Sequence, residues 1–326
     1  IVAMAKSHMA DGELVEKSLA GHADQVRPCT RCDLCGNANT YGTSMRCAIN
    51  PRLGQTGPIE PAPVKKKVMV IGGGPGGQTL VARGHEVTLY EKQDKLGGLL
   101  NDATQLPFKG YMRGYLAWDI KTTLACGAKI CLNTEVTEEL VAKEDPDAVI
   151  VATGSTYLKP PIPGIDHPKV KAVRDVDGKS VDVGDTVVVC GAGLSGVECA
   201  LALAQEGKKV TVIDMIPAED FCATMPIFNK ADLFDQLEKG GVQLVGNVKI
   251  KAFTDGGVEA VDGDGNDVLF AGDAYVNALG VAPNGKLGLA LMAKYGTDVY
   301  MVGDCVGKGR NYMDANQEAY HAAMRI

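Results

Sequence analysis

The sequence lacks three features that would point to a membrane, nucleic-acid or secreted protein. Nowhere in its 326 residues does an apolar run approach the ~20 residues that a membrane-spanning helix needs. Basic residues are not in excess, because 33 Lys and Arg face 40 Asp and Glu and the formal net charge is −7. This balance argues against nucleic acid and anionic membranes as main partners. No secretory signal opens the chain.

A redox disulfide motif is also missing from most of the chain. Six of the ten cysteines form no C-x-x-C pair, namely Cys126, Cys131, Cys190, Cys199, Cys222 and Cys305. In a chain without a secretory signal, cysteines favour metal ligation or reduced thiols over a disulfide framework. The sequence therefore predicts a cytoplasmic protein, long enough for two or three domains, whose electrons do not pass through a cysteine pair.

Two glycine-rich motifs, each placed directly after a buried strand, are the most informative feature present. "KKKVMVIGGGPGG" and "DTVVVCGAGLSG" both follow the pattern G-x-G-x-x-G, and the next strands, "EVTLYE" and "KVTVID", both end in an acidic residue. The first motif consists of Gly72, Gly74, Gly77 and Glu91, and the second motif consists of Gly191, Gly193, Gly196 and Asp214. Such glycines let the backbone approach a pyrophosphate at a helix N-terminus, and the carboxylate accepts hydrogen bonds from ribose hydroxyls.

Two dinucleotide sites in one chain predict an α/β protein in which a nicotinamide nucleotide reduces a flavin. A carboxylate at Asp214 suits two free ribose hydroxyls and repels a 2′-phosphate, which favours NADH over NADPH. The nearby Lys208 and Lys209 weaken that preference only slightly, because they precede the strand.

The two motifs differ in length. Gly196 and Asp214 are 18 residues apart, whereas Gly77 and Glu91 are only 14 apart. Four residues are about one helical turn. Either the helix after the first motif is one turn short, or residues are absent from this record of the chain; we favour absent residues.

The motifs resemble those of two-dinucleotide flavoprotein reductases, in which a smaller NAD(P)H domain is inserted into an FAD domain. The resemblance rests on "GGGPGG", "YEKQDKLGG", "AVIVATGS" and "VYMVGDC". It implies that FAD is held by Gly72, Gly74, Gly77, Glu91, Gly97, Gly98, Thr153, Gly154, Gly303 and Asp304. It implies that NADH is held by Gly191, Gly193, Gly196, Glu198 and Asp214. Apart from the resemblance, we expect Tyr312 only to line the FAD pocket.

Four cysteines lie within nineteen residues ahead of the first motif. The spacing is Cys29-x2-Cys32-x2-Cys35-x11-Cys47. Four thiolates can hold either tetrahedral zinc or an iron–sulfur cluster. Three clustered cysteines with a fourth farther along favour a 4Fe-4S cluster over zinc or free thiols, and a one-electron carrier also gives reduced FAD an acceptor.

The stretch "MAKSHMADGELVEKSLAGHADQVRPCTRC" followed by "RCAINPRLG" resembles one group of Old Yellow Enzyme relatives. The group includes 2,4-dienoyl-CoA reductase, 2-enoate reductase and trimethylamine dehydrogenase, in which an FMN-binding (β/α)8 barrel precedes the cluster. The resemblance implies electron flow from NADH to FAD, to the cluster and to FMN, for reduction of an activated C=C bond in a small enoate-type substrate. It also implies that Lys6 contacts the FMN phosphate and that the protein is a homo-oligomer.

The resemblance further sets the expected domains. These are residues 1–27 as the C-terminal strand and helix of the barrel, 28–60 as the cluster loop and linker, 65–180 with 272–326 as the FAD domain, and 181–271 as the NAD(P)H domain. A (β/α)8 barrel needs about 250 residues, so the rest of the barrel, with its catalytic and substrate-binding residues, is expected elsewhere, in the same polypeptide. Within the NAD(P)H domain, "ADLFDQLEKGG" predicts an amphipathic helix and "GVEAVDGDGNDVLF" predicts a β-hairpin with an Asp-Gly turn.

Three alternatives stay open at this point. In a trimethylamine-dehydrogenase-like arrangement, the first motif would hold ADP, although an intact second motif argues against it. The chain also resembles the small subunit of glutamate synthase, whose cysteines lie in a helical domain. The third alternative is a separate NADH-driven electron-transfer subunit, against which the absence of an initiator Met speaks.

Overall fold

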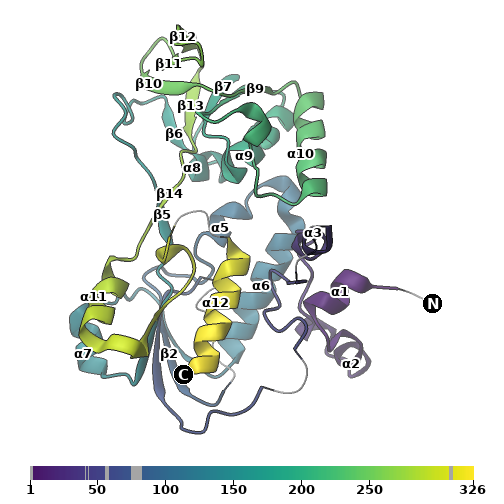
Figure 1. Ribbon diagram of the computed structural model, residues 1–326, viewed down its shortest axis with the longest axis vertical. Helices are drawn as coiled ribbons and strands as arrows, with labels where there is room; N and C mark the ends of the chain where they lie inside the picture. The colour runs from purple at the N-terminus through teal and green to yellow at the C-terminus, as the bar shows by residue number, and fades with distance from the viewer. Residues whose placement is uncertain (1–2, 41, 43, 56–58, 75–82, 308–310) are drawn as a thin grey trace. The chain divides into compact units, whose positions relative to one another are not determined.

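The computed structural model describes residues 3–40, 42, 44–55, 59–74, 83–307 and 311–326. The chain divides into two compact units (Figure 1). Unit 1 comprises Ile1–Thr104, Gly110–Thr156 and Ala282–Ile326, and unit 2 comprises Gln105–Lys109 and Tyr157–Val281. Within the described ranges, no helix combines the length and the apolar character that crossing a bilayer requires.

Unit 1 is built on a parallel sheet with the strand order β15-β4-β1-β2-β3. Its strands are β1 (Lys67–Ile71), β2 (Glu86–Tyr90), β3 (Lys129–Cys131), β4 (Ala148–Val151) and β15 (Val299–Met301). Its helices are α1 (Ala5–Ala10), α2 (Leu14–Leu19), α3 (Leu34–Thr40), α5 (Leu100–Ala103), α6 (Gly110–Ala125), α7 (Glu138–Glu144), α11 (Lys286–Tyr295) and α12 (Tyr312–Arg325). The predicted α/β fold is confirmed.

Both faces of this sheet are covered, which explains the unbroken apolar run of β1. Val68 and Val70 point to one face and pack with Ala319 of α12, whereas Ile71 points to the other face and packs with Leu291 of α11. Since parallel strands end at the same edge of their sheet, the loops after β1, β2, β4 and β15 gather at one edge.

Unit 2 repeats the arrangement of four strands of unit 1, because β13-β7-β8-β9 corresponds to β4-β1-β2-β3, but its edge strand β6 comes first in the chain and not last. Its parallel sheet has the order β6-β13-β7-β8-β9, so β7 takes the place that β1 has in unit 1. The strands are β6 (Val170–Ala172), β7 (Thr186–Cys190), β8 (Lys209–Ile213), β9 (Gln243–Val245) and β13 (Ala274–Asn277). The helices are α8 (Val173–Asp177), α9 (Leu194–Gln205) and α10 (Ile227–Lys239). The short strands β5 (Ser155–Tyr157) and β14 (Val281–Pro283) pair where the chain passes between the units.

Two predicted elements of unit 2 are confirmed. Helix α10 buries Leu233 and Leu237 and ends at Gly240. The expected hairpin is formed by β11 (Val258–Val261) and β12 (Asp267–Phe270), and with β10 (Lys249–Phe253) it makes an antiparallel three-stranded sheet. Helices cover one face of the parallel sheet, and this antiparallel sheet covers the other.

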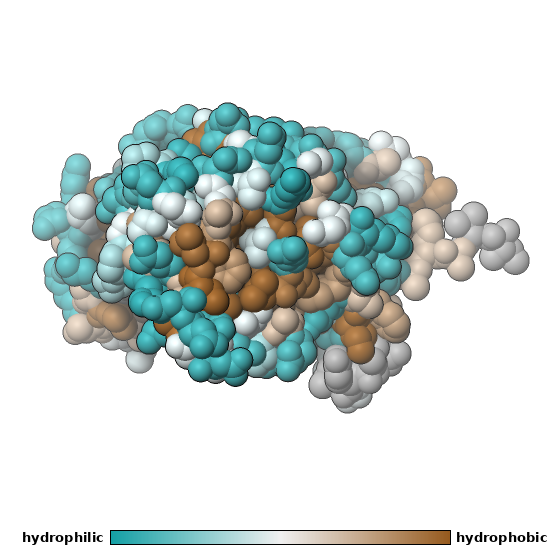
Figure 2. Space-filling view, turned by 90° about the horizontal axis from the view of Figure 1, so that it is seen from above, coloured by the Kyte–Doolittle hydropathy of each residue, from teal (hydrophilic) through white to brown (hydrophobic). Residues whose placement is uncertain are grey.

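The compact unit extends beyond the expected limits of 181 and 271. Besides Gln105–Lys109 it contains Tyr157–Val281, and within that range β6 pairs with β13 and β13 pairs with β7. Figure 2 shows one face of the molecule, where apolar residues gather among hydrophilic ones. The large exposed apolar side chains of unit 2 include Leu194, Met215, Ile216, Ile227 and Phe228.

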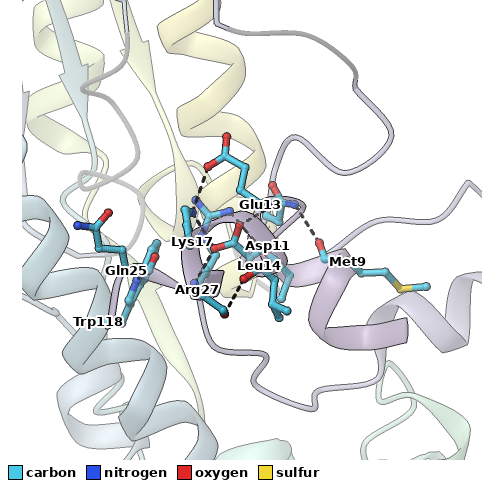
Figure 3. Close-up of polar contacts among 11 residues, drawn as sticks. Met9, Asp11, Glu13, Leu14, Lys17, Gln25, Arg27 and Trp118 are labelled. Carbon is cyan, nitrogen blue, oxygen red and sulfur yellow. Dashed lines mark hydrogen bonds and ion pairs between the residues drawn. The ribbon is translucent and has the colours of Figure 1, made fainter. Parts of the chain in front are cut away.

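Residues 3–27 form two short helices and a turn around one buried carboxylate (Figure 3). Asp11, 5% exposed, accepts hydrogen bonds from Glu13 N at 3.0 Å, Lys17 Nζ at 2.8 Å and Arg27 N at 2.8 Å. Burial opposes ionisation, yet these donors hold the pKa of Asp11 below its usual value. The expected strand is not seen in the described part of this segment, where helix α1 already begins at Ala5; residues 1 and 2 lie outside it.

Candidate dinucleotide sites and cysteine segment

The acidic residue of the first motif braces the glycine loop. Glu91, 7% exposed, accepts a hydrogen bond from Gly73 N at 2.8 Å through Oε2 and one from Gln93 N at 2.8 Å through Oε1. A carboxylate offers about four lone-pair sites, so both oxygens can still accept from a ribose. Glu91 thus holds the loop and presents acceptors at the same edge of the sheet.

The glycines of the first motif have different roles. A Cβ on Gly72, whose φ is +112°, would lie 2.3 Å from the carbonyl oxygen of Ala152, so only glycine fits there. Apart from its chain neighbours, none of the described atoms lies within 4 Å of where a Cβ on Gly74 would be. Close approach of a ligand's phosphate needs this arrangement. Gly77 lies outside the described residues, as does the segment in which the motifs differ in length.

Gly97 and Gly98 pack directly on this loop. Gly97 N donates to Gly73 O at 2.8 Å, and a Cβ on Gly98 would lie 3.3 Å from the Cα of Gly74. Both have positive φ, +113° and +51°. The structure therefore brings Gly97 and Gly98 next to Gly73 and Gly74, as a shared dinucleotide site requires.

The remaining residues expected at the FAD site lie at the ends of β4 and β15. Thr153 Oγ1 donates to Asn284 O at 2.7 Å, and Asn284 N donates to Gly154 O at 2.9 Å. Ser155 Oγ donates to Asp304 Oδ2 at 3.0 Å, which fixes that carboxylate. A further bond, from Gly303 N to Glu318 Oε2 at 2.8 Å, ties the turn after β15 to helix α12.

Asp214 of the second motif makes the same pair of contacts as Glu91. Its Oδ2 accepts from Ala192 N at 2.6 Å, and its Oδ1 accepts from Ile216 N at 3.3 Å. In both motifs, one carboxylate oxygen accepts from the amide of the second loop residue. The other oxygen accepts from the amide two positions after the acidic residue. The sequence pattern indicates only a ligand role for Glu91 and Asp214; their hydrogen bonds to the loop backbone are visible only in the structure.

The glycines repeat as well. Gly191, also with φ +112°, has the carbonyl oxygen of Ala278 2.3 Å from where its Cβ would lie. Gly193 faces open space within 4 Å and is the N-cap of α9. A Cβ on Gly196 would lie 2.0 Å from Gly191 O, so this glycine permits close packing of the helix on the strand.

Glu198 forms an ion pair that the sequence does not reveal. Its Oε1 contacts Lys109 Nζ, and the two side chains are only 12% and 16% exposed. Burial raises the pKa of Glu198, and the lysine offsets part of that rise. Since Lys109 is 89 positions away in the chain, only the fold brings the two together. Both residues belong to unit 2.

The four cysteines of the segment Cys29–Cys47, hereafter the cysteine segment, lie in one region of unit 1. All ten cysteines are described, and none of them forms a disulfide. Cys47 is buried in an apolar cluster with Tyr115 and Leu116 of α6, and Cys29 and Cys32 pack against that cluster. Burial raises the pKa of the Cys47 thiol, with smaller contributions from the nearby Cys32 and Cys29. The pKa of the Cys35 thiol is also raised, mainly by burial and to a smaller extent by Cys32.

The backbone turns tightly at Cys32. Both of its neighbours, Arg31 and Asp33, have left-handed conformations with φ of 55° and 59°. Among the described residues, no three His, Cys, Asp or Glu side chains converge as ligands of a single metal ion. A four-iron cluster holds its cysteine sulfurs farther apart than one ion does, because the iron–sulfur cage lies between them. Four cysteine thiols from one segment are the donor set that such a cluster takes.

Lys6 lies at the cysteine segment. Its Nζ forms an ion pair with Asp33 Oδ1, and this bond raises the pKa of Lys6. The nearby Cys35 and Cys29 side chains add smaller contributions to the rise in the pKa of Lys6. The structure thus brings the predicted FMN-phosphate residue to the loop that carries the predicted cluster.

Tyr312 of α12 contacts the cysteine segment. Its hydroxyl lies 3.1 Å from Thr30 Oγ1 and is hydrogen-bonded to the Cys32 side chain. Two further residues of α12 hold the cysteine segment by its backbone: Asn316 Nδ2 donates to Ala48 O at 2.9 Å, and Gln317 Nε2 donates to Cys47 O at 3.4 Å. Helices α12 and α6 lie side by side here (Figure 1).

Comparison with known proteins identifies a family. A family model described as pyridine nucleotide-disulphide oxidoreductase matches residues 66–324. Two curated relatives match almost the whole chain. An NADH oxidase of Thermoanaerobacter brockii is 32% identical over 338 residues, covering 100% of this chain and 52% of the relative. A bilirubin reductase of Mediterraneibacter gnavus is 34% identical over 333 residues, covering 99% of this chain and 51% of the relative.

A solved structure agrees with these relatives. A 2-naphthoyl-CoA reductase in complex with 2-naphthoyl-CoA superposes with a TM-score of 0.90 at 31% identity, covering 99% of this chain and 50% of that one. These relatives fit the flavin reductase group that the motifs predict, so the predicted resemblance is confirmed. The chain spans about half the length of the curated relatives it matches.

Proposed function

The chain belongs to the pyridine nucleotide-disulphide oxidoreductase family, and we propose that it is the NADH-dependent electron-input part of a flavin and iron–sulfur reductase. The observation that carries this proposal is the repeated bracing of a glycine loop by a carboxylate, once in each unit. Two such loops supply two dinucleotide sites, which a hydride transfer between two nucleotides requires.

In the first site, the loop amides at Gly72 to Gly74 would hold the diphosphate of FAD. The space at Gly74 would admit the phosphate oxygens, and Glu91, which already accepts from Gly73 N, would also accept hydrogen bonds from the ribose. Gly97 and Gly98 close the loop from the side, and Asp304, oriented by Ser155, would accept a hydrogen bond from the flavin side chain.

The second site would hold NADH. Gly193 begins helix α9, whose N-terminal amides suit a pyrophosphate, and Asp214 would accept from both adenosine ribose hydroxyls. The carboxylate repels a 2′-phosphate. Lys208 and Lys209 lie at the opposite end of β8, about 15 Å away by strand rise, and Lys208 Nζ donates to Gly184 O. Neither lysine is placed to neutralise such a phosphate.

Cys29, Cys32, Cys35 and Cys47 would hold a 4Fe-4S cluster. When bound, FAD accepts a hydride and a cluster carries single electrons, so the proposed path is NADH to FAD to 4Fe-4S to the FMN of a barrel and then to an activated C=C bond. Relatives named cinnamate reductase and 2-naphthoyl-CoA reductase support an enoate-type or acyl-CoA substrate.

The test is anaerobic addition of NADH or NADPH to the purified protein with its bound cofactors. We expect NADH to bleach the flavin absorbance, and NADPH to do so much more slowly. Flavin that NADH leaves oxidised would contradict the proposal. ADP in place of FAD in the cofactor extract would instead favour the trimethylamine-dehydrogenase-like arrangement.

A further inference from the structure

Hydrogen bonds reach the sulfurs of the cysteine segment from two kinds of donor. Arg31 N donates to Cys29 Sγ at 3.4 Å. Backbone donors also serve two other thiols: Gly36 for Cys35, and Ile49 and Asn50 for Cys47. At Cys32 a side chain takes part, the hydroxyl of Tyr312. A backbone donor survives most substitutions, whereas this side-chain donor can be deleted by one change.

The direction of the bond at Cys32 follows from the chemistry of the two groups. A cysteine that ligates iron is a thiolate and can only accept, so Tyr312 must donate its single hydroxyl proton to the sulfur. A tyrosine phenol ordinarily titrates at about pH 10, so it has a proton to donate at neutral pH. Thr30 Oγ1, 3.1 Å away, then donates to the phenol oxygen.

The position of Tyr312 is fixed by its helix. It is the first residue of α12, which is capped by Asn311, whose Oδ1 accepts from Met313 N at 2.8 Å. One turn later, Asn316 is fully buried and bonds Ala48 O. Farther along, Glu318 holds the amide of Gly303 at the proposed FAD site. Helix α12, held by these bonds, therefore places the Tyr312 hydroxyl within hydrogen-bonding distance of the Cys32 side chain.

We propose that Tyr312 is a positioning residue for electron transfer, whose hydroxyl donates a hydrogen bond to Cys32 Sγ and raises the reduction potential of the cluster bound there. The inference rests on the proposed function, because it assumes that the four cysteines hold a 4Fe-4S cluster. Reduction adds negative charge to the cluster and its sulfurs. A hydrogen bond donated to the sulfur therefore stabilises the reduced form of the cluster more than the oxidised form.

The experiment is a redox titration of the cofactor-loaded protein, followed by electron paramagnetic resonance of the reduced cluster. Tyr312→Phe removes only the hydroxyl and keeps the ring. The matched control is Tyr320→Phe on the same helix, because the Tyr320 hydroxyl bonds Gln55 Oε1 at 2.7 Å instead of a cysteine. Thr30→Val is a second variant, which keeps Tyr312 but removes the partner that orients its hydroxyl.

We expect Tyr312→Phe to move the midpoint potential in the negative direction. At a fixed solution potential, the ratio of reduced to oxidised cluster should fall several-fold, where each tenfold change corresponds to about 59 mV for one electron. Thr30→Val should shift the potential in the same direction by less, and Tyr320→Phe should leave it unchanged.

Two results would overturn the inference alone: an unchanged potential in Tyr312→Phe with its cluster intact, or an equal shift in Tyr320→Phe. If Tyr312→Phe loses its iron, Thr30→Val decides, and an unchanged potential there overturns the inference. A wild-type protein that contains flavin but no iron would overturn both this inference and the cluster part of the proposed function, so the two failures are distinguishable.

Discussion

Lys109 and Glu198 form an ion pair largely shielded from water, with Nζ of the lysine against Oε1 of the glutamate. Removing one member of such a pair leaves the other charge buried without a partner, which costs far more than removing both. The pair therefore stabilises unit 2 only while both members are present. Glu198 lies in α9, the helix that begins at the second motif.

A double-mutant cycle tests this pair. We expect Lys109→Met to lower the free energy of unfolding by about 3 kcal/mol. The double variant Lys109→Met/Glu198→Gln should recover most of the loss, because no buried charge remains. Urea unfolding of the four proteins provides the measurement, and additive effects of the two changes would contradict the account.

The two kinds of glycine in the first motif should respond differently to alanine. Gly72→Ala combines a positive φ with a Cβ 2.3 Å from Ala152 O, so it should lower both the thermal stability and the flavin content. The methyl group of Gly74→Ala would meet no atom within 4 Å in the described part of the chain, its neighbours in sequence aside. This variant should keep the stability but lose flavin, because its methyl group occupies the space proposed for the phosphate. Equal loss of stability in the two variants would refute this distinction.

Asp214 should set the choice of nicotinamide nucleotide. Replacing it with Ser removes the repulsion of a 2′-phosphate together with a ribose acceptor. We expect KM for NADH to rise and the preference for NADH over NADPH to fall at least about tenfold, which is about 1.4 kcal/mol. Lys208→Ala is the control and should leave the preference unchanged, because Lys208 bonds Gly184 O instead. Steady-state reduction of an artificial electron acceptor measures both.

Asp119 should make stability depend on pH. It lies on α6, 5% exposed, where burial raises its pKa to about 7 and Arg27 offsets part of the rise. Its pKa is thus higher in the folded than in the unfolded protein. The stability that it contributes is present below about pH 4 and is lost as the pH rises to about 7.

Asp119→Asn should therefore remove a decline in the free energy of unfolding between about pH 5 and pH 8. At about pH 8 the variant should be the more stable protein, by at most about 4 kcal/mol. The control is Asp24→Asn, which alters an exposed carboxylate that pairs with Lys121 of the same helix. Its profile over this pH range should match the wild type. A variant Asp119→Asn as pH-dependent as the wild type would contradict the assignment.

The sequence predicted those parts of the fold that depend on local pattern. A buried strand followed by a glycine loop identified β1 and β7, and amphipathic spacing identified α10. The extent of unit 2 was not predictable in this way. It depends on β6 pairing with β13, about a hundred residues later in the chain, and neither strand is long enough to stand out.

The candidate sites show the same division. Spacing along the chain identified the glycines, the two carboxylates and the four cysteines. The contacts made by three other residues could not be predicted, because each partner is far away in the sequence. These contacts are Lys109 with Glu198, Tyr312 with Cys32, and Asn316 with Ala48. A lone lysine or tyrosine on a helix has no pattern that distinguishes it from a surface or packing residue.

The central claim is that one chain binds a flavin that accepts electrons from NADH and passes them to an iron–sulfur cluster. The most direct test is quantitative analysis of the cofactors of the anaerobically purified protein, by flavin extraction and by iron and acid-labile sulfide determination. The account predicts FAD equimolar with the chain, and iron and sulfide in the amounts of a 4Fe-4S cluster. Exchange of Cys32 and Cys47 for serine should remove the iron and leave the FAD. Protein that carries ADP in place of FAD, or FAD without iron, would contradict it.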